Sequence, residues 1–218
     1  MGFKFRIFCL IRIVIILKYY TQIYRDLSIQ DEWLLYSEFD SDTFEPVIGE
    51  RIYHRELAKK YGLTYSKEYS SAEIARKLGG YPRYLILGEE GSLDEKSCYE
   101  LTSVLMPFTD QGQCHFYYDI LKLVNEVPDL QDYKDGLLYN GLLSNVLKVY
   151  NSGNRAGLGS PTYLWDNERS WCLYTDYDSD FSILGGNEKL AMKLLNNPTL
   201  ECIQIDLNTR VDVEEAQE

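Results

Sequence analysis

Three carboxylates at alternate positions, Asp176, Asp178 and Asp180, are the side chains whose type and spacing first suggest chemistry. EF-hand calcium loops open with acidic residues at every second position, but they also need glycine at the sixth position and glutamate at the twelfth. Phe181 and Asn187 stand there instead. Carboxylates at alternate positions also line exposed strand edges, where their charge opposes edge-to-edge pairing. We therefore expect a solvated strand edge and no metal site, with a metal-dependent enzyme as the alternative.

Histidine and cysteine give weak support for nucleophilic catalysis. The chain has two histidines, His54 and His115, and a Cys–His hydrolase would have to pair one of them with a residue such as Cys114 or Cys172. Cys114 and His115 are adjacent, so on a strand they would point to opposite faces. The sequence also lacks the GxSxG and HExxH motifs. We predict a non-catalytic protein without catalytic residues or cofactors.

Two tryptophans, Trp165 and Trp171, flank an acidic and basic turn. In a structural role both rings would be largely buried, with Asp166 or Glu168 paired with Arg169 to hold a hairpin. In a functional role the exposed edge would be a recognition patch, because Trp, Tyr and Arg dominate binding hot spots. We expect the structural role. The candidate binding residues are Trp165, Asp166, Arg169, Trp171, Asp176, Asp178 and Asp180.

Charge and composition restrict the kind of partner. The net charge is −12, which repels phosphate backbones and attracts basic proteins. The segment from Glu56 to Ser70 imitates a helix-turn-helix, but Glu68 and Ser71 occupy positions where a recognition helix needs apolar residues. Nineteen tyrosines add surface suited to protein contacts. We therefore expect a basic protein partner and no nucleic acid.

The N-terminal segment from Phe5 to Leu17 is strongly apolar, but it is interrupted by Arg6 and Arg12. It is shorter than the roughly 20 residues that a membrane span needs. It is predicted to be a packed strand or helix, or an extension outside the domain, and membrane anchoring stays as an alternative. We expect an apolar segment or extension at 1–28 that is dispensable for folding, an α+β domain at 29–208 and a disordered acidic tail at 209–218.

The five cysteines contain no CxxC pair and indicate a reduced, cytoplasmic protein.

Periodicity and capping residues predict helices followed by a β-rich C-terminal part. Helices are expected over 53–61, 70–78 and 93–105, and the segments 114–124 and 136–150 fit either a strand or a helix. Strands are expected over 162–165, 170–175, 181–184 and 200–205, with Gly185-Gly186 turning into a helix that Asn187 caps. Together these elements predict a single α+β domain with a mixed or antiparallel sheet, completed by a C-terminal β-β-β-α-β unit.

The C-terminal part resembles the signature of a bacterial protein family of unassigned function that is abundant in actinobacteria. The matching residues, in order, are Arg169, Trp171, Cys172, Thr175, Asp178, Gly185, Gly186, Leu200 and Glu201. Upstream, LTSVLMPFTDQGQCHFYYD is similar to another segment of that family, so the resemblance covers about Leu93 to Ile205. It implies a shared fold unit and supplies no catalytic residues.

Small acidic proteins of this kind also resemble the immunity proteins of bacterial toxin systems. The leading functional hypothesis is therefore a non-catalytic cytoplasmic binding protein of the immunity type, which would neutralise a basic toxin or another cationic protein. The alternatives are a metal-dependent enzyme using Asp176, Asp178 and Asp180, and a membrane-associated protein anchored by residues 5–17.

Overall fold

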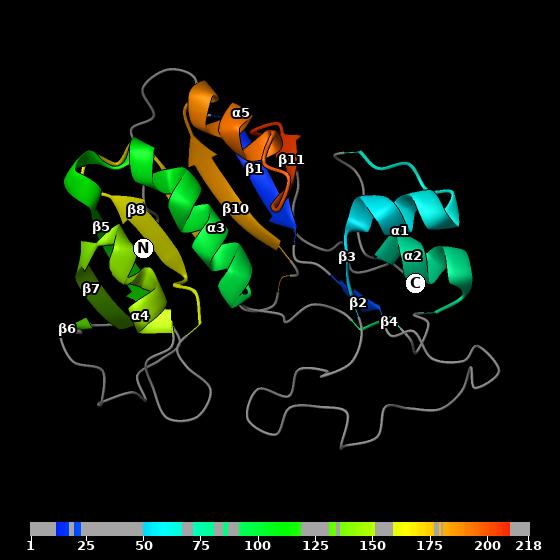
Figure 1. Cartoon of the computed structure of the whole chain (residues 1–218), viewed down its shortest axis with the longest axis horizontal. Coiled ribbons are helices and arrows are strands. Elements are labelled where there is room, and N and C mark those ends of the chain that lie inside the picture. The colour runs from blue at the N-terminus through cyan, green and yellow to red at the C-terminus, as the bar shows by residue number, and fades with distance from the viewer. Residues whose placement is uncertain are drawn as a thin grey trace.

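An antiparallel eight-stranded sheet, covered on one face by three helices, forms the main body of the protein in a computed structural model (Figure 1). Two further helices and a three-stranded sheet form a small lobe at one end. The structure describes residues 12–17, 20–22, 50–66, 72–80, 85–86, 92–118, 131–133, 136–150, 159–176, 179 and 181–209. The prediction of a single α+β domain is confirmed, and the sheet is antiparallel.

The strand order of the large sheet brings the two ends of the described chain together. From one edge to the other it runs β11 (Glu201–Ile205), β1 (Arg12–Leu17), β10 (Phe181–Gly186), β9 (Cys172–Thr175), β8 (Tyr163–Asp166), β5 (Gln113–Tyr118), β7 (Gly136–Leu142) and β6 (Gln131–Tyr133). The small sheet has the order β3 (Glu50–Ile52), β2 (Tyr20–Gln22), β4 (Leu85–Ile86). The predicted β-β-β-α-β unit is present as β8, β9, β10, α5 and β11.

Local capping interactions set the helix ends. The helices are α1 (His54–Tyr61), α2 (Ala72–Leu78), α3 (Glu95–Leu105), α4 (Val146–Tyr150) and α5 (Glu188–Leu195). Asp94 accepts a hydrogen bond from the Ser97 backbone nitrogen at 3.0 Å, and Asn187 accepts one from Leu190 at 2.9 Å. Gly62 ends α1 in the left-handed region, at φ 64°, where glycine avoids the steric penalty of a Cβ. The residues from 62 to 71 separate α1 from α2, more than the about three or four of a helix-turn-helix.

Alternation along the strands divides the sheet into two faces. Inward side chains such as Phe116, Leu173 and Leu184 are buried against Leu105 of α3 and Leu194 of α5. The side chains between them in the sequence point to the opposite face and are only half-buried. We call this second side, away from α3, α4 and α5, the outer face.

The apolar N-terminal segment contributes a strand to the interior of the sheet. β1 pairs with β10 on one side and with β11 on the other, and both Val14 and Ile16 are fully buried. The expected extension outside the domain is therefore wrong for residues 12–17, and the packed strand is what forms. An apolar run satisfies its backbone groups by pairing on both sides while its side chains fill the core. No helix within the described residues is long and apolar enough to cross a membrane.

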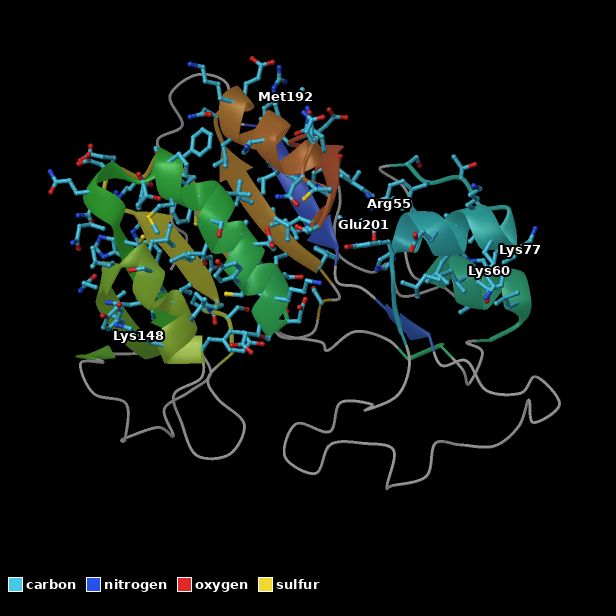
Figure 2. All side chains as sticks on the ribbon, in the orientation of Figure 1. Arg55, Lys60, Lys77, Lys148, Met192 and Glu201 are labelled. Atoms are coloured by element: carbon cyan, nitrogen blue, oxygen red, sulfur yellow. The ribbon has the colours of Figure 1, made fainter. Side chains whose placement is uncertain are left out.

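A buried carboxylate joins the small lobe to the main sheet. Glu201 of β11 is 2% exposed, and it accepts hydrogen bonds from the backbone nitrogens of His54 at 2.6 Å and Arg55 at 2.7 Å. Figure 2 shows Glu201 pointing from β11 toward Arg55. These nitrogens belong to the first turn of α1, where a negative charge is favourable. The Tyr53 hydroxyl adds a hydrogen bond to the Thr199 carbonyl at 3.3 Å.

Deleting residues 1–28 should prevent folding rather than leave a soluble domain. The deletion removes β1 and leaves the facing edges of β10 and β11 without their partner. We expect the shortened chain to aggregate on expression while the full chain stays soluble, as judged by soluble yield and circular dichroism. As a control, a deletion of residues 210–218 at the other end of the chain removes none of the described strands of the large sheet and should leave the protein soluble. A cooperative, soluble product lacking 1–28 would contradict the placement of β1.

Candidate functional site

The hairpin between β8 and β9 is held by Asp166. Its carboxylate, 1% exposed, accepts hydrogen bonds from the Ser170 nitrogen at 2.7 Å, the Ser170 hydroxyl at 2.8 Å and the Trp171 nitrogen at 3.2 Å. Arg169 is exposed and takes a left-handed conformation at φ 55°. The predicted ion pair between Arg169 and an acidic residue of the turn does not form among these described residues. Two backbone nitrogens and the Ser170 hydroxyl satisfy Asp166 instead, because the turn folds back over its carboxylate.

Trp171 belongs to the core, as predicted. It is 2% exposed and lies in the same cluster as Leu173, Leu184 and Leu190. Gly186, at the end of β10, lies close to it, and a Cβ built there would stand 2.8 Å from Leu190 Cδ2 and 3.5 Å from Trp171 Cβ. A larger residue at position 186 would force the Leu190 side chain of α5 to move. Both Gly185 and Gly186 lie inside strand β10 and pair with β1, so the prediction that they form the turn into the helix is wrong.

Trp165 lies on the outer face, apart from Trp171. It is half-buried, between the inward-facing Leu164 and Asp166, and it lies outside the core cluster that contains Trp171. Its indole stacks on the His115 ring, with centroids 5.1 Å apart and planes inclined by 11°. His115 Nδ1 in turn makes a hydrogen bond with Asn140 Oδ1. Strands β8, β5 and β7 each supply one residue of this group.

Three tyrosines extend the aromatic surface along the same face. Tyr117 and Tyr163 have ring centroids 6.2 Å apart, and Tyr163 stacks on Tyr174 at 4.8 Å. The Tyr174 hydroxyl donates a hydrogen bond to Asp176 Oδ2 at 2.6 Å. The registers of β5, β8 and β9 place these residues in cross-strand positions, where aromatic pairs stabilise a sheet. We call the set His115, Tyr117, Tyr163, Trp165 and Tyr174 the aromatic face.

Sequence reasoning found Trp165 and missed most of its neighbours. In the sequence, His115 suggests only a catalytic base, and no motif marks Asn140. Every second residue of a strand lies on the same face of the sheet. The alternating side chains of 113–118, 163–166 and 172–175 therefore indicate which residues share the face of Trp165. The pairing of these strands, which decides which aromatic residues meet, cannot be obtained from alternation alone.

The aspartate triplet is only partly described. Asp176 lies directly after β9 and is half-buried beside Tyr174, whereas Asp178 and Asp180 lie outside the described residues. Within the part of the chain that the structure describes, no group of three or more His, Cys, Asp or Glu side chains is placed to hold a metal ion.

The described cysteines are held as protonated thiols. Burial, followed by the negative charge of Asp166, raises the pKa of both Cys114 and Cys172 to about 12. Burial also raises the pKa of Cys98 and of Cys202 to about 12, with acidic neighbours adding to the effect. Cys114 is buried on the inner side and His115 lies on the outer face, as their adjacency predicted. These thiols therefore lack the thiolate character that nucleophilic catalysis requires.

The charges are unevenly distributed along the chain. Residues 50–80, which include α1 and α2, contain seven Lys or Arg and four Asp or Glu, so the rest of the chain has a net charge of −15. The exposed basic residues of the lobe include Lys59 and Lys60 of α1 and Arg76 and Lys77 of α2. Figure 2 shows Lys60 and Lys77 on the lobe, away from Glu201. The described residues outside 50–80, most of which build the large sheet and its three helices, carry a net charge of −5.

Comparison of the chain with protein-family models, with curated proteins and with solved structures gave no match. The resemblance to the bacterial signature stays a prediction. Five of the signature residues, Trp171, Thr175, Gly186, Leu200 and Glu201, are buried in this structure. In this structure these residues pack the C-terminal β-β-β-α-β unit, and Glu201 joins the small lobe to the large sheet.

Trp171→Ala should lower the free energy of unfolding by about 3–5 kcal/mol, because it empties a large volume of the core. Trp165→Ala should cost less, since its ring is half-buried on the outer face. The measurement is urea denaturation of both variants, monitored by far-UV circular dichroism. Equal losses for the two variants, or wild-type stability of Trp171→Ala, would contradict the division of the two tryptophans between core and outer face.

The thiols predict a loss of stability at alkaline pH. Unfolded thiols titrate at a pKa of about 8.5, whereas Cys98, Cys114, Cys172 and Cys202 titrate in the folded protein at about 12. Between these values the unfolded chain binds fewer protons at these thiols, so their effect on stability is absent below about pH 8.5 and lowers stability above it. We expect the urea midpoint to be lower at pH 9.5 than at pH 7.5, with a smaller decrease in Cys98→Ala. An equal or higher midpoint at pH 9.5 would contradict the burial of these groups.

Proposed function

We propose that this protein is a non-catalytic binding protein that receives a basic protein partner, in the manner of an immunity protein masking a toxin. The observation that carries the proposal is the aromatic face, which gathers Trp165, His115 and three tyrosines on the side of an acidic body that α3, α4 and α5 leave uncovered. Aromatic rings of this kind supply large contact areas at little cost in side-chain entropy.

Electrostatics supports a basic partner. The described residues outside 50–80 carry a net charge of −5 in a chain of −12, and a negative potential speeds the approach of a cationic protein. The basic lobe repels the same partner, so the two regions together favour approach toward the sheet. The described thiols, all kept protonated by burial, support binding rather than covalent chemistry.

A reduced compartment suits these cysteines. Cys98, Cys114, Cys172 and Cys202 are free and at least partly buried, which agrees with a cytoplasmic protein whose thiols serve in packing. We place the protein and its partner in the cytoplasm, where an immunity protein meets the toxin made by the same cell.

Affinity capture from the native cell lysate tests this function. At low salt the tagged protein should retain a basic protein, and retention should decrease as salt screens the attraction. Co-expression should then protect cells from the retained protein if it is toxic, and the product of a neighbouring gene is the first candidate. A double variant, Trp165→Asp with Tyr163→Asp, should lose both retention and protection, whereas Tyr99→Ala, which alters an exposed aromatic residue of α3, should keep them. Absence of any retained basic protein, together with no protection, would refute the proposal.

A further inference from the structure

We propose that the stacked pair Trp165 and His115, fixed in place by Asn140, is a binding site for an arginine side chain of the partner. This inference rests on the proposed function and specifies its chemistry at one site. The three residues come from neighbouring strands β8, β5 and β7, and their backbones are held by paired register. A site on strands inside a sheet is rigid, so little ordering is needed when a ligand binds.

The hydrogen bond to Asn140 determines what His115 offers to a ligand. Asn140 presents its amide oxygen to His115 Nδ1, and an amide oxygen can only accept, so this contact is a hydrogen bond in the tautomer that carries its proton on Nδ1. In the neutral imidazole the second nitrogen, Nε2, is then an acceptor. His115 is half-buried on the outer face, where Nε2 can accept a hydrogen bond from an incoming N–H group. The site therefore requires a donor rather than an acceptor.

The indole of Trp165 adds an attraction for cations. Tryptophan binds a cation over its ring more strongly than tyrosine or phenylalanine does. A planar guanidinium can stack on the indole and direct one N–H toward His115 Nε2, whereas the compact, strongly hydrated lysine ammonium cannot do both equally well. In the turn after β8 the charges of Glu168 and Arg169 cancel each other. At the tyrosine end of the aromatic face, Asp176 adds a negative charge.

Binding of two synthetic peptides, octa-arginine and octa-lysine, to the full chain provides the test. Both should bind the acidic protein at low salt, but octa-arginine should bind about 5-fold more tightly, as measured by fluorescence anisotropy of labelled peptides. Of the three tryptophan indole N–H signals in a nitrogen–proton NMR spectrum, the Trp165 signal, assigned with Trp165→Phe, should shift most with octa-arginine.

Variants separate this site from general charge attraction. Trp165→Ala and His115→Ala should each abolish the preference for arginine while octa-lysine binding stays within about 2-fold of the wild type. Asn140→Ala should reduce the preference, because Asn140 positions His115 and need not touch the ligand. The control Tyr99→Ala, on the helical side of the sheet, should keep the wild-type preference.

Two outcomes would overturn the proposals at different levels. Equal binding of both peptides by the wild type, with no selective shift of the Trp165 signal, would refute the arginine site and leave a basic partner possible. Binding of neither peptide at low salt would refute the proposed function itself. Both outcomes are read from the wild-type protein, so they do not depend on the folding of any variant.

Discussion

Pairing of β1 on both of its edges is the interaction on which the rest of the structure depends. β1 connects β10 to β11, so it holds the two C-terminal strands in one sheet and brings Val14 and Ile16 into the core. β11 in turn presents Glu201, whose carboxylate receives the first backbone nitrogens of α1. The attachment of the basic lobe to the acidic body therefore depends on a strand supplied by the other end of the chain.

Strand alternation separates the core residues of a short hairpin from those of the proposed binding surface. Asp166 and Trp171 point inward, where one satisfies the turn backbone and the other fills the core, while Trp165 points outward and stacks on His115. Residues that are nearly adjacent in the sequence therefore have independent roles. A substitution on the outer face can change binding without emptying the core, which lets this surface vary on a constant scaffold.

The function proposed for this protein combines two physical terms that act at different ranges. In this proposal the net negative charge acts over about 8 Å in physiological salt and sets how a basic partner approaches. The aromatic face acts only in contact and sets which side chains fit. The buried thiols, with pKa values raised to about 12, contribute to packing.

The sequence by itself determined the local features of this protein, because they depend on residues close together in the chain. Asp94, Asn187 and Gly62 specified helix ends, and alternation specified the strands from 162 to 205 and the C-terminal β-β-β-α-β order. The segment 136–150 has helical spacing, yet its first half is strand β7, since pairing with β5 and β6 satisfies its backbone. Tertiary structure alone decided that β1 is internal, that Trp165 meets His115, and that Glu201 caps α1. Each of these depends on hydrogen bonds or ring contacts between segments far apart in the chain, whose pairing register has no local signal.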